Sequence, residues 1–421
     1  MTLSIQTDRS LIRAEARSTR YVLVSLDAPS AERRTTRSPI NVSLVLDRSG
    51  SMGGEKLMLA KQATENALRL LGPADRFSLV TYDDVVEVVA PATFATPEAI
   101  RQALELLARV DARGSTDLCG GWMRGCEQIA LHQIDAGTNR CLLLTDGLAN
   151  RGTTGHDELV RIAGDLAGRG VQTTTFGVGA DFDERLLRDM AEAGQGHFYF
   201  IETPGQIPDL LASEVGEALD VVARHATLRV ALPNGASAEC LNRYRQVRVQ
   251  GDNELHVQLG DLVSAQRVEL VIRLVMPAGP LGDSLGVDVW LSDADGTLGG
   301  ASHTMRWTFA SHDDNDRQPR NRVVDRVVAA IYAARARADA TECNRHHDFE
   351  RARHVMTETA RRIRRYAGDD AELGRIADEL LRDVETFAVR EMAPLDRKVA
   401  FFAAEATMKF RDPVGKARRS R

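Results

Sequence analysis

The feature that most constrains this chain is the regular alternation of short apolar segments with longer amphipathic segments between residues 39 and 220. Short apolar runs bounded by turn residues are typical of strands that are buried on both faces, and the longer segments have the spacing of helices. Strands that alternate with helices form a mostly parallel sheet with helices on both faces. This part of the chain is therefore expected to be a doubly wound α/β domain.

The expected strands and helices of this domain follow one another along the chain. We expect strands at residues 41–46, 76–82, 139–145, 170–178 and 197–201. We expect helices at residues 55–71, 97–109, 118–134, 157–169, 183–193 and 206–219. Thr96 and Asp117 directly precede two of these helices, so we expect their side chains to cap them.

The segments on either side of this domain have a different pattern. From residue 225 to about residue 310, short β-prone segments alternate with turn residues, which is typical of a small antiparallel sandwich with one solvated face per sheet. The strand-like segment at residues 21–26 has no partner within the α/β domain. We therefore expect it to join the sandwich, so that the α/β domain is an insertion between sandwich strands.

The remainder of the chain is expected to be helical. Segments with helical spacing occur at residues 321–339, 347–366, 371–388 and 395–410, and such segments pack as a small bundle. The 421 residues also exceed the roughly 150 residues of an ordinary domain. We therefore divide the chain into an N-terminal β segment, the α/β domain, the sandwich and a helical C-terminal domain, at residues 1–38, 39–222, 223–312 and 320–412.

The composition is that of an ordinary globular protein. The five cysteines form no C-x-x-C pair, which argues against a zinc ribbon or a disulfide framework and favours reduced, buried thiols. No apolar run approaches the roughly 18 residues of a membrane span, and the first residues lack the apolar stretch of a secretory signal. A cytoplasmic protein without a membrane segment is the simplest expectation.

The most basic point of the chain is a cluster of arginines in the helical region. Arg361, Arg362, Arg364 and Arg365 lie there, although the whole chain has a formal net charge of −6. We favour a solvated helix face, whose arginines pair with nearby Asp and Glu residues, over a patch for nucleic acid or an acidic partner. Nucleic acid is therefore not an expected partner.

Side chains with oxygen atoms follow the ends of two expected strands and precede one expected helix. Asp47, Ser49 and Ser51 stand in the turn after the first apolar strand. Asp146 follows a second apolar strand, and Thr116 directly precedes a helix. Ligands bind at the edge of an open α/β sheet where its strands end, and Mg²⁺ prefers oxygen ligands. The first turn alone would equally suit a helix cap, but three loops that each supply an oxygen favour a cation site.

This pattern resembles the metal-ion-dependent adhesion site of von Willebrand A domains, and the resemblance covers residues 39–220. Asp47-x-Ser49-x-Ser51 is its first part, followed by Thr116 in a Gly-Ser-Thr-Asp loop and Asp146 in a Thr-Asp-Gly turn. The resemblance implies that both serines bind the cation directly and that the threonine binds it directly or through water. The two aspartates would act mainly through waters and hydrogen bonds.

The resemblance also implies a cofactor and a partner. The cation would be Mg²⁺, with Mn²⁺ or Ca²⁺ as alternatives, and its open coordination position would take a Glu or Asp carboxylate of a partner protein. Arg48 occupies the variable position of the motif. Its charge at the rim of the site could assist the binding of an acidic partner. We favour the alternative that Arg48 is a solvated loop residue without this role. The segments 176–183 and 194–201 resemble bacterial members related to calcium-activated chloride channel homologues, which does not imply a channel here.

No enzyme signature supports a catalytic function. The spacing of a phosphate loop fails at residues 50–56, and no H-E-x-x-H motif occurs. Among nearby polar residues, Asp83 and Asp84 suit a plain turn and His197 suits a structural role. We therefore expect a binding module and not an enzyme. Two alternatives stay open, namely an adaptor for a MoxR-type AAA+ ATPase or a chelatase-like complex, and a scaffold that assembles from copies of this chain.

Overall fold

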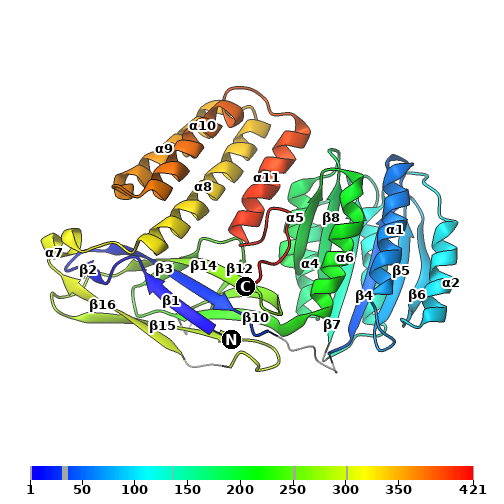
Figure 1. Ribbon diagram of the computed structural model, residues 1–421, viewed down its shortest axis with the longest axis horizontal. Coiled ribbons are helices and arrows are strands. Elements are labelled where there is room, and N and C mark those ends of the chain that lie inside the picture. Colours follow the sequence, from blue (N-terminus) through cyan, green and yellow to red (C-terminus); the bar gives the residue numbers. More distant parts are fainter. Residues whose placement is uncertain (1, 31–36, 136, 250–252, 300–301, 421) are drawn as a thin grey trace. The chain divides into compact units, whose positions relative to one another are not determined.

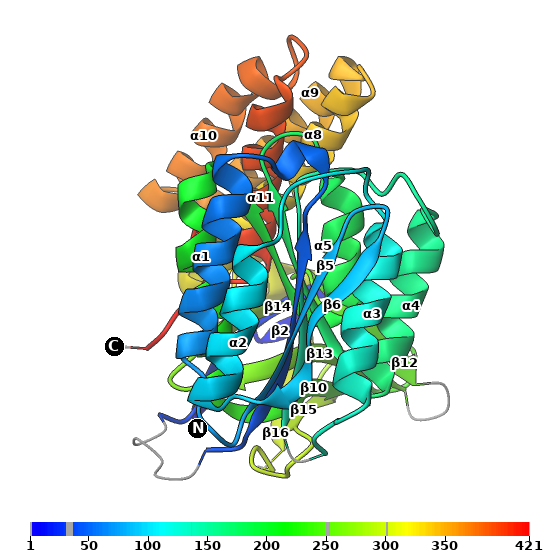
Figure 2. The same ribbon diagram turned by 90° about the vertical axis from the view of Figure 1, so that its right-hand side faces the viewer.

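The computed structural model describes residues 2–30, 37–135, 137–249, 253–299 and 302–420. The chain divides into two compact units, whose elements are labelled in Figures 1 and 2. The first unit comprises Ala31–Val221 with Val414–Lys416. The second comprises Met1–Ser30, Val222–Pro413 and Ala417–Arg421. The second unit therefore contains both the sandwich and the helical region, and the division of these into two separate domains stays a prediction.

The first unit is built on a six-stranded sheet with the order β6-β5-β4-β7-β8-β9. The strands are β4 (Ile40–Asp47), β5 (Arg76–Tyr82), β6 (Val86–Phe94), β7 (Thr138–Thr145), β8 (Gln172–Val178) and β9 (Gln195–Ile201). All neighbours pair in parallel except β6, which pairs antiparallel with β5 at the edge. The predicted doubly wound, mostly parallel sheet is confirmed. The edge strand β6 was missed because it contains Pro91, and proline lowers the expectation of a strand except at an edge.

Helices cover both faces of this sheet, as Figure 2 shows. The helices of the unit are α1 (Glu55–Arg69), α2 (Pro97–Ala108), α3 (Leu118–Ala130), α4 (His156–Gly168), α5 (Glu184–Ala193) and α6 (Ile207–Leu219). Helices α1, α2 and α6 share one core with the sheet, and α3, α4 and α5 lie on the other face. Helix α3 packs closely because Gly121 has no side chain: a Cβ there would lie 2.4 Å from Cγ of the buried Tyr82.

The direction in which strands are added reverses at β4. The chain first adds β5 and β6 on one side of β4 and then crosses back to add β7 on the other side. As a result, β4 continues into α1 on one face of the sheet, whereas β7 continues toward α4 on the opposite face. The loops after β4 and β7 separate at this point, and open α/β sheets bind ligands at such a crevice.

The second unit contains two mostly antiparallel sheets, with the orders β1-β3-β14-β11 and β12-β13-β10-β15-β16-β2. The N-terminal segment supplies β1 (Thr2–Thr7), β2 (Leu11–Arg13) and β3 (Ser18–Asp27). The strands after the α/β unit are β10 (Val221–Ala231), β11 (Ser237–Cys240), β12 (Arg245–Val249), β13 (Glu254–Val263), β14 (Arg267–Met276), β15 (Ser284–Ser292) and β16 (His303–Ala310). Because β3 pairs with β14 over its whole length, the expected insertion of the α/β domain between sandwich strands is confirmed.

Helices complete the second unit. They are α7 (His312–Arg317), α8 (Arg322–Arg345), α9 (Phe349–Ala367), α10 (Ala371–Phe387) and α11 (Pro394–Met408). Helix α8 packs on the sheet through Val324 and Val328, which contact Leu23 of β3 and Val271 of β14, and its other side joins α9 and α10 in a separate core. The helical C-terminal region is as predicted, whereas α7 lies in a segment too polar to predict a helix.

The structure bears on two expectations drawn from composition, which concern the cysteines and membrane-spanning segments. The five cysteines are all buried and unpaired, as expected for reduced thiols. Within the described ranges, no helix combines the length and the apolar character that a membrane span requires.

Candidate metal centre

The predicted site residues begin where β4 and β7 end side by side. Leu46 of β4 pairs with Leu144 of β7, so Asp47 and Asp146 stand at the ends of adjacent strands. Both strands consist entirely of buried residues, because their apolar side chains face helices on both sides. This rigid pair of strands holds the two carboxylates at the crevice.

The carboxylate of Asp47 is fixed through both of its oxygens. Oδ1 accepts a hydrogen bond from the backbone N–H of Ser49 at 2.8 Å, and Oδ2 accepts one from Oγ1 of Thr145 at 2.6 Å. Burial raises the pKa of Asp47 to about 6, although the hydrogen bonds from Ser49 and Thr145 oppose this shift. A bound cation would favour the ionised carboxylate.

A chain of oxygen atoms leads from the serines to Asp146. Oγ of Ser49 lies 3.2 Å from Oγ of Ser51, and the Ser51 hydroxyl donates to Oδ1 of Asp146 at 2.6 Å. Ser49 and Asp146 are buried, whereas Ser51 is exposed. The group therefore has a buried anionic floor and one side that is open to solvent.

Thr116 reaches the same place from a third loop. The carbonyl oxygen of Gly114 accepts a hydrogen bond from Gly50 N–H at 3.2 Å, and Thr116 N–H donates to Oδ1 of Asn150 at 3.0 Å. A Cβ built on Gly147, next to Asp146, would lie 3.5 Å from Oγ1 of Thr116. The structure thus brings the five predicted residues together from three loops. Asn150 carries no sequence signal, because only the fold places it beside Thr116.

A lysine that the sequence did not single out lies against this group. Nζ of Lys56, in the first turn of α1, lies 2.5 Å from Oδ2 of Asp146 and 3.3 Å from the carbonyl oxygen of Ser51. A positive charge therefore already neutralises one carboxylate of the site. In the sequence, Lys56 is indistinguishable from a solvated residue of an amphipathic helix.

The structure corrects the expectation for Arg48. Its side chain is 5% exposed, with Nε 3.1 Å from Asp83 and Nη1 2.9 Å from Glu87 on β6. The favoured solvated loop position is therefore wrong, because two carboxylates from the neighbouring strands draw the guanidinium inward. The prediction that Arg48 contacts a partner has no support from this arrangement.

Asp83 forms the expected turn and also holds the rim of the site. Its Oδ1 accepts from Val85 N–H at 2.6 Å, and Oδ2 accepts from Nε of Arg113 at 2.7 Å. Burial alone would raise the pKa of Asp83, but these hydrogen bonds and the charge of Arg48 hold it below its ordinary value. Arg113 begins the loop that carries Thr116, so Asp83 ties that loop to the turn after β4. Asp117 caps α3 as predicted.

A second group of metal-capable side chains lies on β9 and α6. His197, Glu214 and Glu217 each place one ligand atom within 4.8 Å of the others. Glu214 is buried and accepts hydrogen bonds from Arg140 at 2.8 Å and Tyr199 at 2.7 Å, besides its contact with His197. Because a buried arginine already neutralises Glu214, the group is better explained as a structural network, as expected for His197.

A pentapeptide with the spacing G-x-S-x-G also occurs, at residues 282–286. In hydrolases this motif places a serine between a strand and a helix. Here Ser284 is the first residue of β15 in the sandwich, so the motif lacks the context of a nucleophile.

The comparisons with known proteins agree with the fold of the first unit. Residues 41–213 match the family model described as von Willebrand factor type A domain. "Uncharacterized protein YfbK" of Escherichia coli (strain K12) is 27% identical over 261 residues, which cover 60% of this chain and 45% of that protein. "Uncharacterized protein sll0103" of Synechocystis sp. is 26% identical over 279 residues, which cover 64% of this chain and 65% of that protein. The chain thus spans less than two thirds of either relative.

A solved structure resembles almost the whole chain. "von Willebrand factor type A from Catenulispora acidiphila" aligns over 99% of this chain and 97% of that chain, with a TM-score of 0.71 and 20% identity. At this identity the likeness shows the fold alone. The relation to calcium-activated chloride channel homologues stays a prediction.

Proposed function

Because this chain is a von Willebrand A domain protein with bacterial relatives, we propose that it binds a divalent cation and uses it to hold an acidic side chain of a partner protein. Von Willebrand A domains generally mediate protein–protein interactions. Many bind a divalent metal at an adhesion site. The proposal assigns both properties to the crevice after β4 and β7.

The observation that carries this proposal is the convergence of oxygen atoms at the crevice. Ser49, Ser51 and Thr116 supply hydroxyl groups, and Asp47 and Asp146 supply carboxylates. This donor set fits Mg²⁺, which prefers oxygen ligands and keeps several waters; Mn²⁺ and Ca²⁺ share the preference for oxygen. The position of Lys56 supports the same assignment, since the site attracts positive charge.

The exposed side of the group supports a role in binding a partner. A cation held by hydroxyls and by carboxylates that act through water keeps much of its charge, and it attracts an anionic ligand to any open position. Ser51 is exposed, so a carboxylate of another protein can reach this side. The cation would supply the attraction, while the chain's own hydroxyls fix its position.

We expect capture of a partner to depend on the cation. With the full chain immobilised in an extract of its source, a partner should be retained in Mg²⁺ and released by EDTA. A Ser49→Ala/Ser51→Ala variant should retain none, because two hydroxyl ligands are absent. In the captured partner, one Glu→Gln or Asp→Asn substitution should abolish retention. The control is Asp165→Ala, which removes an exposed carboxylate on α4.

The outcomes of this capture separate the proposal from its alternatives. Equal retention in Mg²⁺ and EDTA would contradict a cation-dependent site. Capture of an AAA+ ATPase would identify an adaptor. If the chain captures only itself, light scattering should show larger assemblies in Mg²⁺ than in EDTA, which would identify a scaffold.

A Lys56→Met variant is expected to bind Mg²⁺ up to about fivefold more tightly, because a partly exposed ion pair contributes up to about 1 kcal/mol. In the wild type, the ammonium group must leave Asp146 or repel the arriving cation. Calorimetric titration of both proteins measures the difference. Weaker binding by the variant would mean that Lys56 orients Asp146 and does not compete with the cation.

A further inference from the structure

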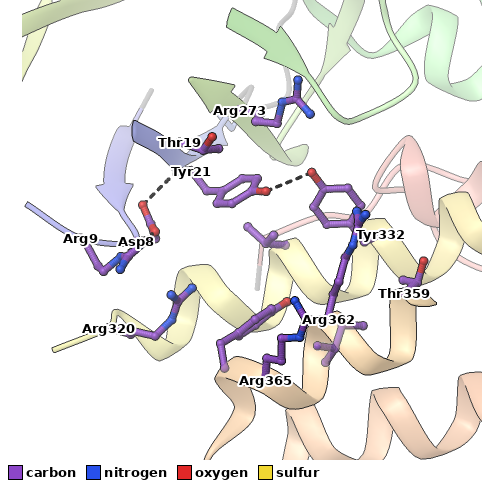
Figure 3. A pocket seen from close by; sticks show the side chains of 13 residues that line it. Asp8, Arg9, Thr19, Tyr21, Arg273, Arg320, Tyr332, Thr359, Arg362 and Arg365 are labelled. Carbon is purple, nitrogen blue, oxygen red and sulfur yellow. Dashed lines mark hydrogen bonds and ion pairs between the residues drawn. The ribbon is translucent and has the colours of Figure 1, made fainter. Parts of the chain in front are cut away.

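A cavity of about 420 Å³ lies in the second unit, between β3 and β14 on one side and α8 and α9 on the other. This volume falls in the range of small-molecule sites, about 300–1,000 Å³. Figure 3 shows its lining, in which arginine and tyrosine side chains gather around the pair Tyr21 and Tyr332. The cavity and the candidate metal centre belong to different units of the fold.

The lining of the cavity is strongly basic. Five arginines contribute to it, namely Arg9, Arg273, Arg320, Arg362 and Arg365. The one carboxylate in the lining is Asp8, which is buried and accepts a hydrogen bond from Tyr21 N–H at 2.9 Å. Guanidinium groups only donate hydrogen bonds, so the cavity presents donors and positive charge to whatever enters it.

Two of these arginines stay without any ion pair. Within the described residues, neither Arg362 nor Arg365 has a carboxylate partner. Their neighbours on the same helix differ: Arg361 and Arg364 form ion pairs at 2.7 and 2.5 Å. The expectation of a solvated, paired helix face is therefore confirmed for Arg361 and Arg364. Arg362 and Arg365 are exposed as well, but the expected pairing with carboxylates is wrong for them within the described residues.

The remaining arginines differ in how fully their hydrogen-bonding groups are used. Arg320 is engaged, since its Nε donates to Asp325 at 2.8 Å and its guanidinium stacks on the ring of Tyr366. Arg273 is less engaged. It lies 3.6 Å from Glu239, and its Nε is buried without a hydrogen-bond partner among the residues described. A buried donor of this kind is costly unless a ligand or water accepts from it.

The tyrosine pair leaves one further donor. The hydroxyl oxygens of Tyr21 and Tyr332 lie 3.1 Å apart, and their rings meet edge to face. Burial and the contact with Tyr332 raise the pKa of Tyr21, so its hydroxyl keeps its proton. Because one O–H is enough for the bond between the two oxygens, the other O–H is free to donate to a ligand.

We propose that this cavity binds a small phosphate ester that carries an aromatic ring, with its phosphate held by Arg362 and Arg365. A phosphate dianion balances the two arginines that lack ion pairs, and the planar guanidinium matches its oxygens with paired hydrogen bonds. The tyrosine rings, with Val328 and Ile363, give the rest of the ligand an apolar wall. A polymer such as nucleic acid would require an extended basic surface, whereas this site is a pocket of small-molecule size that is partly open to solvent.

The test is a calorimetric titration of the full chain with adenosine 5′-monophosphate in EDTA. We expect saturable binding that weakens at least about tenfold in Arg362→Ala and in Arg365→Ala, since each removes charged hydrogen bonds. Arg361→Ala and Arg364→Ala are the matched controls, because they remove arginines of the same helix that are also exposed but do not line the cavity. Both variants should bind like the wild type. Ribose 5-phosphate, adenosine and inorganic phosphate complete the series and should all bind more weakly.

Each contrary outcome overturns the proposal. No saturable binding of adenosine 5′-monophosphate, or equal losses in the control variants, would remove the site. Equal binding of inorganic phosphate and the nucleotide would overturn the assignment to an organic ester. Tight binding of a single-stranded oligonucleotide without binding of the mononucleotide would favour a nucleic-acid surface. An Asp47→Asn variant should leave nucleotide binding unchanged, so failure of the metal centre and failure of this site are distinguishable.

Discussion

An Asp47→Asn variant is expected to bind Mg²⁺ and Mn²⁺ about 100-fold more weakly or worse. The loss of one hydrogen-bonding group beside a metal typically lowers metal affinity by about 10- to 100-fold, and this substitution also removes a charge. Asp47 supplies one of the two carboxylates of the site and accepts hydrogen bonds from Ser49 and Thr145. Asparagine keeps the shape of the side chain and one oxygen acceptor. The variant therefore removes the negative charge while retaining most of the geometry of the turn.

Calorimetric titration of both cations into the wild type and the variant measures this loss. Asp165→Asn is the matched control, since Asp165 is exposed on α4 and pairs with Arg161 one turn away. The control should bind the cations like the wild type. Saturable binding of equal affinity in Asp47→Asn would exclude the crevice after β4 and β7 as the metal centre.

Much of the first unit could be predicted because its signals are local. Strands β4 and β7 are buried along their whole length and contain the apolar runs 44–46 and 141–144, as expected of strands that are covered on both faces. Asp47 ends β4 and Asp146 directly follows β7, so the parallel sheet brings these two site residues to one edge. Sequence order and sheet geometry are sufficient for this part of the inference.

The features that the sequence did not reveal depend on contacts between distant segments. Arg48 forms ion pairs with the buried Asp83 after β5 and with Glu87 of β6, a strand that was not predicted. Lys56 reaches Asp146 across 90 positions of the chain. The cavity of the second unit forms where Tyr21 of β3 meets Tyr332 of α8, which are 311 positions apart. The hydrophobic pattern within one segment of the sequence does not predict contacts between residues so far apart.

A second large effect is expected on the stability of the first unit, through the network of His197, Glu214 and Glu217 on β9 and α6. Glu214→Ala is expected to lower the free energy of unfolding of the first unit by about 3–5 kcal/mol, the usual cost of leaving a buried charge without its partner. Arg140 is 3% exposed, and Glu214 accepts its hydrogen bond at 2.8 Å. Glu214 also accepts from Thr174 at 2.8 Å and from Tyr199 at 2.7 Å, so the substitution leaves several buried donors without this acceptor.

Urea dependence of hydrogen exchange in β7 and β8 measures this loss, since these strands report on the first unit alone. Asp209→Ala is the control on the same helix, where Asp209 is exposed, and it should cost less than about 1 kcal/mol.

The same measurement also decides whether His197, Glu214 and Glu217 hold a metal. In an Asp47→Asn background, which lacks the proposed cation site, a structural network should be equally stable in EDTA and in Zn²⁺. Stabilisation by Zn²⁺ in that background, lost with Glu214→Ala, would instead identify the network as a second metal centre.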